Sequence, residues 1–168
     1  VIAEKEKPVL HFGKAEVAFP PGAFAQAVEE AEKAMAGLVL DHLKGRKRIV
    51  DLFAGSGTFA LRLATRANVH AVELDAQALA AMSTASGAYG LRPVTTEQRD
   101  LFDLPLMASE LKRFDGLCLD PPRAGAEAQA IEIAKSTIPS VAYVSCNPKT
   151  LARDAAILVN GGYVIDTV

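Results

Sequence analysis

Apolar residues follow two patterns that alternate along the chain. Short runs that are mostly apolar, or that alternate with polar residues, predict strands at Arg48–Phe53, Val69–Leu74, Val94–Arg99, Phe114–Leu119, Val141–Ser145 and Tyr163–Val168. Stretches between them predict helices at Ala23–Leu43, Thr58–Thr65, Ala76–Ser86, Ala126–Lys135 and Pro148–Val159. Strands separated by helices are typical of a parallel sheet covered on both faces. The sequence therefore predicts an α/β fold with a mostly parallel, twisted sheet.

The first 22 residues differ from the remainder. Short apolar stretches around Val9–Phe12 and Val17–Phe19 predict a hairpin or a loop, and Pro20, Pro21 and Gly22 interrupt the chain after it. No repeat, low-complexity segment or linker follows. Because 168 residues suit one domain, we expect a lead-in segment over residues 1–22 and a single domain over residues 23–168.

Composition excludes several classes of protein. Hydrophobic residues make up 50% and charged residues 23%, which is ordinary for a globular protein and unlike a disordered tail, a fibre or a coiled coil. The absence of a long apolar run and of a signal segment predicts no membrane partner and a cytoplasmic location. The 2 cysteines are too few for a disulfide scaffold or a four-cysteine zinc site, and we expect no metal. A net charge of −2 gives no overall basic footprint for nucleic acid.

Polar and special residues follow the predicted strands. In a parallel sheet, ligands bind outside the carboxyl ends of the strands. The residues at these ends are Asp51 with Gly55 and Gly57, Glu73 with Asp75, Asp100, Asp120 to Arg123, and Cys146 to Pro148. The sequence thus predicts one ligand-binding edge.

The segment Asp51-Leu-Phe-Ala-Gly-Ser-Gly57 predicts a tight turn between strand and helix. Glu73 ends the next strand, where an acid can accept both hydroxyl groups of a ribose. The glycines also match a dinucleotide fingerprint, so an NAD-binding oxidoreductase is an alternative. Asp51 disfavours it, because a pyrophosphate would meet a like charge, whereas the cationic S-adenosylmethionine would be attracted. Asp100 fits a contact to an adenine amino group and an ordinary helix cap equally well.

Two prolines make the loop Asp120-Pro-Pro-Arg123 rigid, as a loop that holds a flat substrate would be. We therefore expect Asp120 and Arg123 to contact the substrate. Methylases of exocyclic amines usually carry an aromatic residue at the position of Arg123, so amine methylation is disfavoured.

Cys146 precedes a good helix N-cap, Asn147, and a proline suited to the first helical turn, Pro148. The field of a helix N-terminus stabilises a thiolate, and Lys149 and Arg153 are expected to add positive potential. A thiolate beside a methyl donor suits pyrimidine chemistry, because its addition to C6 makes C5 a nucleophile. Cys118, inside an apolar strand, has the pattern of a buried structural cysteine.

Three segments resemble the RNA uracil-5-methyltransferase family, namely Asp51–Gly57, Asp120-Pro-Pro-Arg-Ala-Gly125 and Tyr143-Val-Ser-Cys-Asn-Pro-Lys-Thr-Leu-Ala-Arg-Asp154. The resemblance implies a Rossmann-like methyltransferase fold, S-adenosylmethionine as cofactor, and transfer or ribosomal RNA rather than DNA as partner. It implies that Cys146 is the nucleophile. The family's cofactor positions fall on Gln26, Asp51, Phe53, Gly55, Gly57, Thr58, Glu73, Asp100 and Asp120, with Thr58 standing where some members carry Asn.

The chain also departs from this family. The family's catalytic base is a glutamate some tens of residues after the cysteine, beyond Val168, and its RNA-binding portions are absent. We therefore expect a catalytic-domain fragment that is inactive alone. Cytosine-5 methylases usually carry a cysteine in the proline loop, and the lack of one at Asp120–Gly125 favours uracil. A non-catalytic S-adenosylmethionine-binding module remains an alternative.

Overall fold

The computed structural model describes residues 9–13, 15–18, 29–88 and 90–168. Its strands are β1 (Val9–Phe12), β2 (Ala15–Ala18), β3 (Arg48–Leu52), β4 (Asn68–Glu73), β5 (Val94–Gln98), β6 (Gly116–Leu119) and β7 (Val141–Tyr143). Its helices are α1 (Glu29–His42), α2 (Ala60–Leu63), α3 (Ala76–Ala88), α4 (Ala108–Leu111), α5 (Glu127–Ala134) and α6 (Pro148–Asn160).

Strands β3 to β7 form one parallel sheet in the order β5-β4-β3-β6-β7. The chain runs outward from β3 to β5 and then returns to β6 on the other side of β3. The strand order therefore reverses between β3 and β6, which is where ligands bind in open α/β sheets. The predicted Rossmann-like α/β fold is confirmed.

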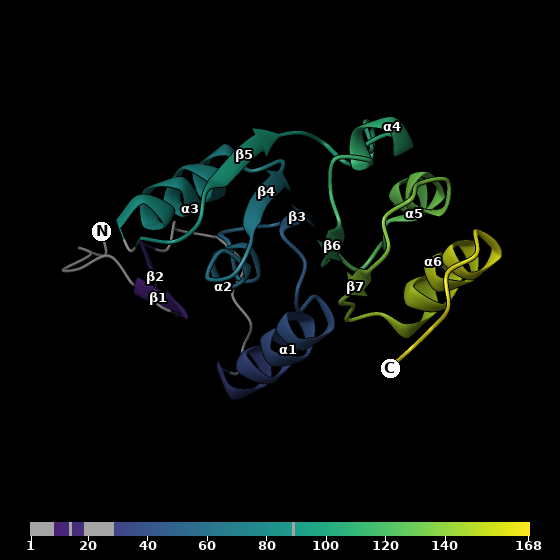
Figure 1. Cartoon of the computed structure of the whole chain (residues 1–168), viewed down its shortest axis with the longest axis horizontal. Coiled ribbons are helices and arrows are strands. Elements are labelled where there is room, and N and C mark those ends of the chain that lie inside the picture. The colour runs from purple at the N-terminus through teal and green to yellow at the C-terminus, as the bar shows by residue number, and fades with distance from the viewer. Residues whose placement is uncertain (1–8, 14, 19–28, 89) are drawn as a thin grey trace, which may run out of the picture.

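Helices cover both faces of the sheet, as Figure 1 shows. Apolar side chains of α1, α2 and α3 pack on one face against residues such as Ile49, Val69 and Cys118. Those of α4, α5 and α6 pack on the other face against Val50, Leu52 and Leu119. Successive strand residues point to opposite faces, so runs that are apolar throughout fill both cores.

The lead-in residues that are described form an antiparallel hairpin, with Phe12 paired to Ala15. Phe12, Ala15 and Val17 are buried in the same core as α1 to α3. The hairpin thus packs on the domain. The predicted boundary at residues 22 and 23 lies outside the described residues, so the domain division stays a prediction.

The structure corrects several of the sequence-based elements. Helix α2 spans only Ala60–Leu63 of the predicted Thr58–Thr65, and β7 ends at Tyr143 rather than Ser145. Tyr163–Val168 was predicted as a strand, but it pairs with no strand in the described part of the chain. Its Tyr163 hydroxyl instead donates to the Ile138 carbonyl at 2.8 Å, and Val164 is 88% exposed. Helix α4 was missed because it spans a single turn, and β6 begins at Gly116 rather than at Phe114.

Candidate active site

The loop after β3 combines an open side with a packed side. Phe53, Gly55 and Gly57 all have positive φ angles, of 59°, 53° and 98°. A Cβ atom on Gly57 would lie 2.8 Å from Cγ of Met82, whereas one on Gly55 would meet nothing within 4 Å. Core packing therefore requires the second glycine, and the first leaves the loop backbone open to a ligand. Phe53 holds a conformation that is costly for a residue with a side chain.

Glu73, at the end of β4, is fixed by backbone donors. Its Oε2 accepts from the Gly55 N–H at 2.9 Å, and its Oε1 accepts from the Leu74 and Asp75 N–H groups at 2.8 and 3.0 Å. The sequence predicted a ribose-binding acid here. The structure shows a second role, because the same carboxylate joins the loop after β3 to the end of β4.

Asp51 is a carboxyl group with unmet hydrogen-bonding capacity. It is fully buried, and neither side-chain oxygen has a hydrogen bond of good geometry among the described residues. Burial, and then the nearby carboxyl of Asp120, raise its pKa to about 8, although the Cys118 thiol and the Ala60 backbone N–H are donors close enough to lower this pKa in part. Burial also raises the pKa of Asp120 to about 6. A pair of crowded carboxyl groups at the point where the strand order reverses favours a cationic ligand and disfavours a phosphate.

Two further predicted cofactor residues, Asp100 and Thr58, lie in or near this loop. Oδ1 of Asp100 accepts from the Phe102 N–H at 2.9 Å, so Asp100 holds the turn after β5. The Phe102 ring lies 5.4 Å from the Phe53 ring. Thr58 is half-buried directly after the glycines. The adjacent ends of β3, β4 and β5 therefore bring these candidates to one edge, as the sequence predicted. Gln26 lies outside the described residues.

Cys146 lies at the other half of the same edge, after β7. Its side chain is exposed, and it directly precedes α6. Oδ1 of Asn147 accepts from the Lys149 N–H at 3.1 Å, and Pro148 occupies the first turn, so the predicted capping is confirmed. Cys118, by contrast, is fully buried in β6, where burial and then Asp51 raise the pKa of its thiol well above the ordinary value.

Asp120 to Gly125 form a loop, which we call the proline loop, and the start of α6 holds it in place. Nδ2 of Asn147 and the Thr150 hydroxyl both donate to the Arg123 carbonyl, at 2.8 and 3.3 Å. The segment after β7 is also joined to β6, because the Val144 N–H donates to the Leu119 carbonyl at 2.9 Å. These contacts bind the helix that follows Cys146 to the loop that follows Asp120.

Asp154 is the buried centre of this attachment. Its Oδ2 accepts from the Ala126 N–H and from the Tyr143 hydroxyl, both at 2.6 Å, and its Oδ1 accepts from Nε of Arg153 at 2.8 Å. Burial opposes ionisation, but these three donors outweigh it and hold the pKa of Asp154 below its ordinary value. The sequence analysis assigned Asp154 no role of its own, because its burial, nearly two turns into α6, is seen only in the structure.

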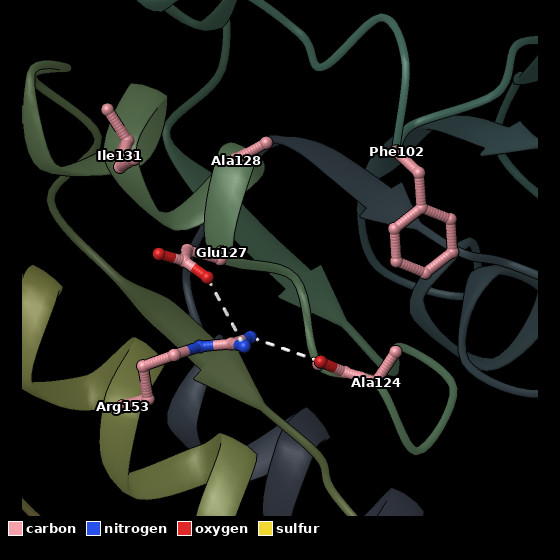
Figure 2. Close-up of a pocket in the computed structure, with 7 residues that line it drawn as sticks. Phe102, Ala124, Glu127, Ala128, Ile131 and Arg153 are labelled. Carbon is pink, nitrogen blue, oxygen red and sulfur yellow. Dashed lines mark hydrogen bonds and ion pairs between the residues drawn. The ribbon is translucent and has the colours of Figure 1, made fainter.

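Arg153 departs from its predicted role. Figure 2 shows its guanidinium turned to the proline loop, where Nη2 donates to the Ala124 carbonyl at 3.1 Å and Nη1 lies 3.3 Å from the Glu127 carboxylate. Its charge is thus paired with Glu127 and Asp154 rather than directed to Cys146. Arg123 and Lys149 are exposed cations of this half of the edge that form no ion pair with the described residues.

Gly125 explains why the proline loop lies so close to α6. Its φ is 77°, and a Cβ atom there would lie 2.7 Å from Nη2 of Arg153, 2.7 Å from Oδ2 of Asp154 and 2.8 Å from Cβ of Thr150. No side chain fits. Sequence analysis placed this glycine in the proline loop without recognising the contact, which needs the fold.

Comparison with known proteins finds similarity to RNA methyltransferases. The sequence model of the tRNA (uracil-5-)-methyltransferase family matches residues 87–165. An uncharacterized RNA methyltransferase of Mesorhizobium japonicum is 59% identical over the whole chain, which spans 41% of that relative's length. The 23S rRNA (uracil(1939)-C(5))-methyltransferase RlmD of Chromohalobacter salexigens is 38% identical over 86% of the chain and 30% of its own length.

The fold comparison agrees. The crystal structure of Pyrococcus abyssi tRNA (uracil-54, C5)-methyltransferase in complex with S-adenosyl-L-homocysteine is similar with a TM-score of 0.79 and 26% identity, over 92% of this chain and 38% of that one. In the described residues, no helix is long and apolar enough to cross a membrane. Sequence, fold and relatives together support membership of the RNA uracil-5-methyltransferase family.

Proposed function

We propose that this chain binds S-adenosylmethionine and methylates C5 of a uridine in transfer or ribosomal RNA, with Cys146 as the nucleophile. One observation carries the proposal. An exposed cysteine at the start of α6 shares an edge of the sheet with Asp51, a buried carboxyl on the neighbouring half that has no hydrogen bond of good geometry among the described residues. The first suits a covalent step on the base, and the second suits a cationic methyl donor.

The residues of the edge fit this cofactor. Asp51 has two buried oxygens without a hydrogen bond of good geometry among the described residues, and a bound amino or sulfonium cation would relieve the cost of burying the charge. Glu73 presents a fixed carboxylate for ribose hydroxyls, and the open side of Gly55 permits close approach. Asp100 and Phe53 would then lie toward the adenine end. When bound, S-adenosylmethionine supplies an electrophilic methyl group.

Methylation of the uracil ring needs a thiolate nucleophile and a group that accepts the C5 proton. Addition of the Cys146 thiolate to C6 of uracil forms a carbon–sulfur bond and moves the C5–C6 electron pair to C5 and O4. Carbon C5 then becomes the nucleophile that accepts the methyl group. Removal of the C5 proton by a base restores the double bond and releases the thiolate. The resemblance to the family implies that this base is a glutamate.

The proline loop supports the substrate half of the site. Its contacts to Asn147 and Thr150 fix Asp120 and Arg123 relative to Cys146. A rigid loop is what positioning of a flat base requires. The exposed cations Arg123 and Lys149 suit the phosphates that flank a target uridine. RNA in the cytoplasm is the substrate consistent with these features.

The decisive test uses RNA that contains 5-fluorouridine. Fluorine at C5 does not leave as a proton, so the covalent adduct accumulates. We incubate the protein, in the length its gene encodes, with this RNA and S-adenosylmethionine, and measure the adduct by denaturing electrophoresis and peptide mass. The adduct is expected on Cys146 and is expected to be absent in Cys146→Ala.

Cys118→Ala is the matched control, because it removes the other thiol while leaving Cys146 and the proline loop unchanged. It is expected to form the adduct normally. An adduct on Cys118, or normal methylation of RNA by Cys146→Ala, contradicts the covalent mechanism. Binding of S-adenosylhomocysteine by both variants shows that each is folded.

A further inference from the structure

The opposite edge of the sheet gathers positive charge. Every strand of a parallel sheet begins at the same edge, so the turns that lead into β3, β4, β5 and β6 lie side by side. These turns carry seven exposed cations, which we call the amino-edge cations: Lys44, Lys47, Arg48, Arg66, Arg92, Lys112 and Arg113. The net charge of −2 hides this concentration because acids dominate the other edge.

Backbone hydrogen bonds confirm that these turns are neighbours. The Asn68 N–H donates to the Lys47 carbonyl at 2.9 Å, and the Asp115 N–H donates to the Arg48 carbonyl at 2.9 Å. The Val69 N–H donates to the Pro93 carbonyl at 3.0 Å. Adjacent strands lie about 4.8 Å apart, so the cations extend over roughly 15 Å. Such a span matches several successive phosphates of a nucleic acid.

The amino-edge cations are available to a partner. None of the seven forms an ion pair with an acid among the described residues. One acid lying among them is Asp115, whose carboxylate accepts from the Lys47 and Arg48 N–H groups. A hollow lined by Arg48, Arg113, His70 and Phe114 lies within the group. The guanidinium of Arg113 is held 4.8 Å from the centre of the Phe114 ring.

We propose that the amino-edge cations bind the phosphate backbone of the RNA substrate, away from the site of methylation. This inference rests on the proposed function, which makes RNA the substrate. The acidic half of the catalytic edge repels a polyanion, so charge alone does not hold the RNA there. Exposed cations without paired acids favour an extended polyanion, and their spread over four strands favours a backbone over a single phosphate. The contact reads no base and contributes affinity rather than specificity.

The test compares neutral and charged replacements of three of these residues. In one variant Lys47→Gln, Arg66→Gln and Arg92→Gln remove three charges, and in the matched control Lys47→Arg, Arg66→Lys and Arg92→Lys retain them. We measure the affinity for a fluorescein-labelled transfer RNA transcript and for a labelled RNA stem-loop between 50 and 300 mM KCl. Calorimetry with S-adenosylhomocysteine verifies that the catalytic edge of each variant is folded.

Each phosphate contact contributes about 0.7 to 0.9 to the slope of log affinity against log salt. Removal of three contacts is therefore expected to lower the slope by about 2 to 3 and to weaken binding about 100-fold at 0.1 M KCl. The charge-retaining variant is expected to bind as the parent does. An unchanged slope in the glutamine variant overturns the proposal, as does binding of polyglutamate in preference to RNA.

The two proposals fail in different ways. If the fluorouridine adduct forms on Cys146 while the glutamine variant binds RNA like the parent, the amino edge is not an RNA surface and the proposed function stands. If the parent forms no adduct but RNA affinity depends on the three charges, the proposed chemistry fails and the surface stands. If the parent binds no RNA at 50 mM KCl, the surface proposal is overturned.

Discussion

The carboxyl and amino edges of the sheet differ in both the sign of their charge and the way in which their side chains are held. At the carboxyl edge Glu73, Asp100 and Asp154 accept hydrogen bonds from backbone N–H groups, and Asp51 is fully buried. At the amino edge the cations are exposed and make no ion pair within the described residues. A fixed, desolvated edge suits a small ligand, and an exposed edge suits a long polyanion.

The same backbone rule produces both edges. Because β3 to β7 are parallel, all the turns that follow strands meet on one side and all the turns that precede strands meet on the other. The acids and cations of a chain with a small net charge are thus placed at opposite edges by the topology of the sheet. The comparison teaches that net charge alone excludes no polyanion-binding surface in such a fold.

The largest expected difference between the two edges is in the stability lost when a glycine with positive φ is replaced by alanine. Gly125→Ala places a Cβ atom within 2.8 Å of Arg153, Asp154 and Thr150, whereas Gly45→Ala at the amino edge, with a φ of 87°, meets nothing within 4 Å. We expect Gly45→Ala to cost about 1–2 kcal/mol, from the backbone alone. Gly125→Ala adds overpacking of about 1–3 kcal/mol and moves the proline loop.

Urea denaturation measures the free energy of unfolding of each variant. Trapping with 5-fluorouridine RNA measures the rate at which each variant forms the Cys146 adduct. Gly45→Ala is expected to form the adduct at the parental rate, and Gly125→Ala to lose it. Equal destabilisation by the two substitutions would show that α6 shifts to accept the added Cβ atom at little cost in free energy. The attachment of α6 to the proline loop would then not position Cys146.

Asp51 supplies a pH-dependent contrast with the amino edge. Its pKa is about 8 in the folded chain and 3.8 as an ordinary value. Between these values the folded state holds a proton that the unfolded state has released, so this group lowers the free energy of unfolding as pH rises from about 4 to about 8. Asn is neutral in both states. Asp51→Asn is therefore expected to stabilise the cofactor-free chain, by roughly 2–4 kcal/mol at pH 9 and by less at pH 5.

The measurement is urea denaturation of the parent and the variant at both pH values. The amino-edge variant Asp115→Asn is the control for replacing an acid by its amide, and it is expected to lose stability because its carboxylate accepts from two backbone N–H groups. The same Asp51→Asn variant is expected to bind S-adenosylhomocysteine more weakly, because the carboxylate that attracts the cation is gone. A gain in stability that is equal at pH 5 and pH 9 would show that Asp51 does not titrate in this range.

The sequence predicted the fold, and which residues lie at the carboxyl edge, better than it predicted the contacts that fix those residues in place. The parallel sheet and the placement of Asp51, Glu73 and Cys146 at one of its edges follow from the alternation of strands and helices and from the rule for parallel sheets. The contacts of Gly125 and Asp154 join residues that are far apart in the chain, so no local pattern reports them. Tyr163–Val168 has an alternating pattern typical of a strand, but no neighbouring strand pairs with it in the described part of the chain.

Substitutions of Glu73 test whether this residue binds the ligand or only supports the loop after β3. Glu73→Ala removes the acceptor of the Gly55, Leu74 and Asp75 N–H groups and the proposed acceptor of ribose hydroxyls. Affinity for S-adenosylhomocysteine is expected to fall by about 1.5–3 kcal/mol, the range for hydrogen bonds to a charged group. Glu73→Gln, which retains one acceptor, is expected to lose less.

A double-mutant cycle identifies which role dominates. The parent and Glu73→Ala are each titrated by calorimetry with S-adenosylhomocysteine and with its analogue lacking the ribose 2′-hydroxyl. If Glu73 binds the ribose, the hydroxyl contributes affinity in the parent and little in the variant. Additive losses would show that Glu73 supports the loop without touching the sugar.

Replacement of Asp115, at the amino edge, is expected to have the smallest effect on stability and on RNA affinity. Its carboxylate accepts from the Lys47 N–H at 3.0 Å and from the Arg48 N–H at 2.8 Å, so it stabilises the turn before β3 while opposing the charge around it. Asp115→Asn retains one acceptor and is expected to cost about 1 kcal/mol of unfolding free energy. It also removes an acid that lies among the amino-edge cations. Affinity for the labelled RNA stem-loop at 50 mM KCl is therefore expected to rise roughly two- to fivefold, and the gain should vanish at 300 mM, where screening is stronger. Weaker RNA binding by this variant at low salt would contradict an electrostatic role for the edge, because removing a negative charge favours a polyanion wherever the two are close.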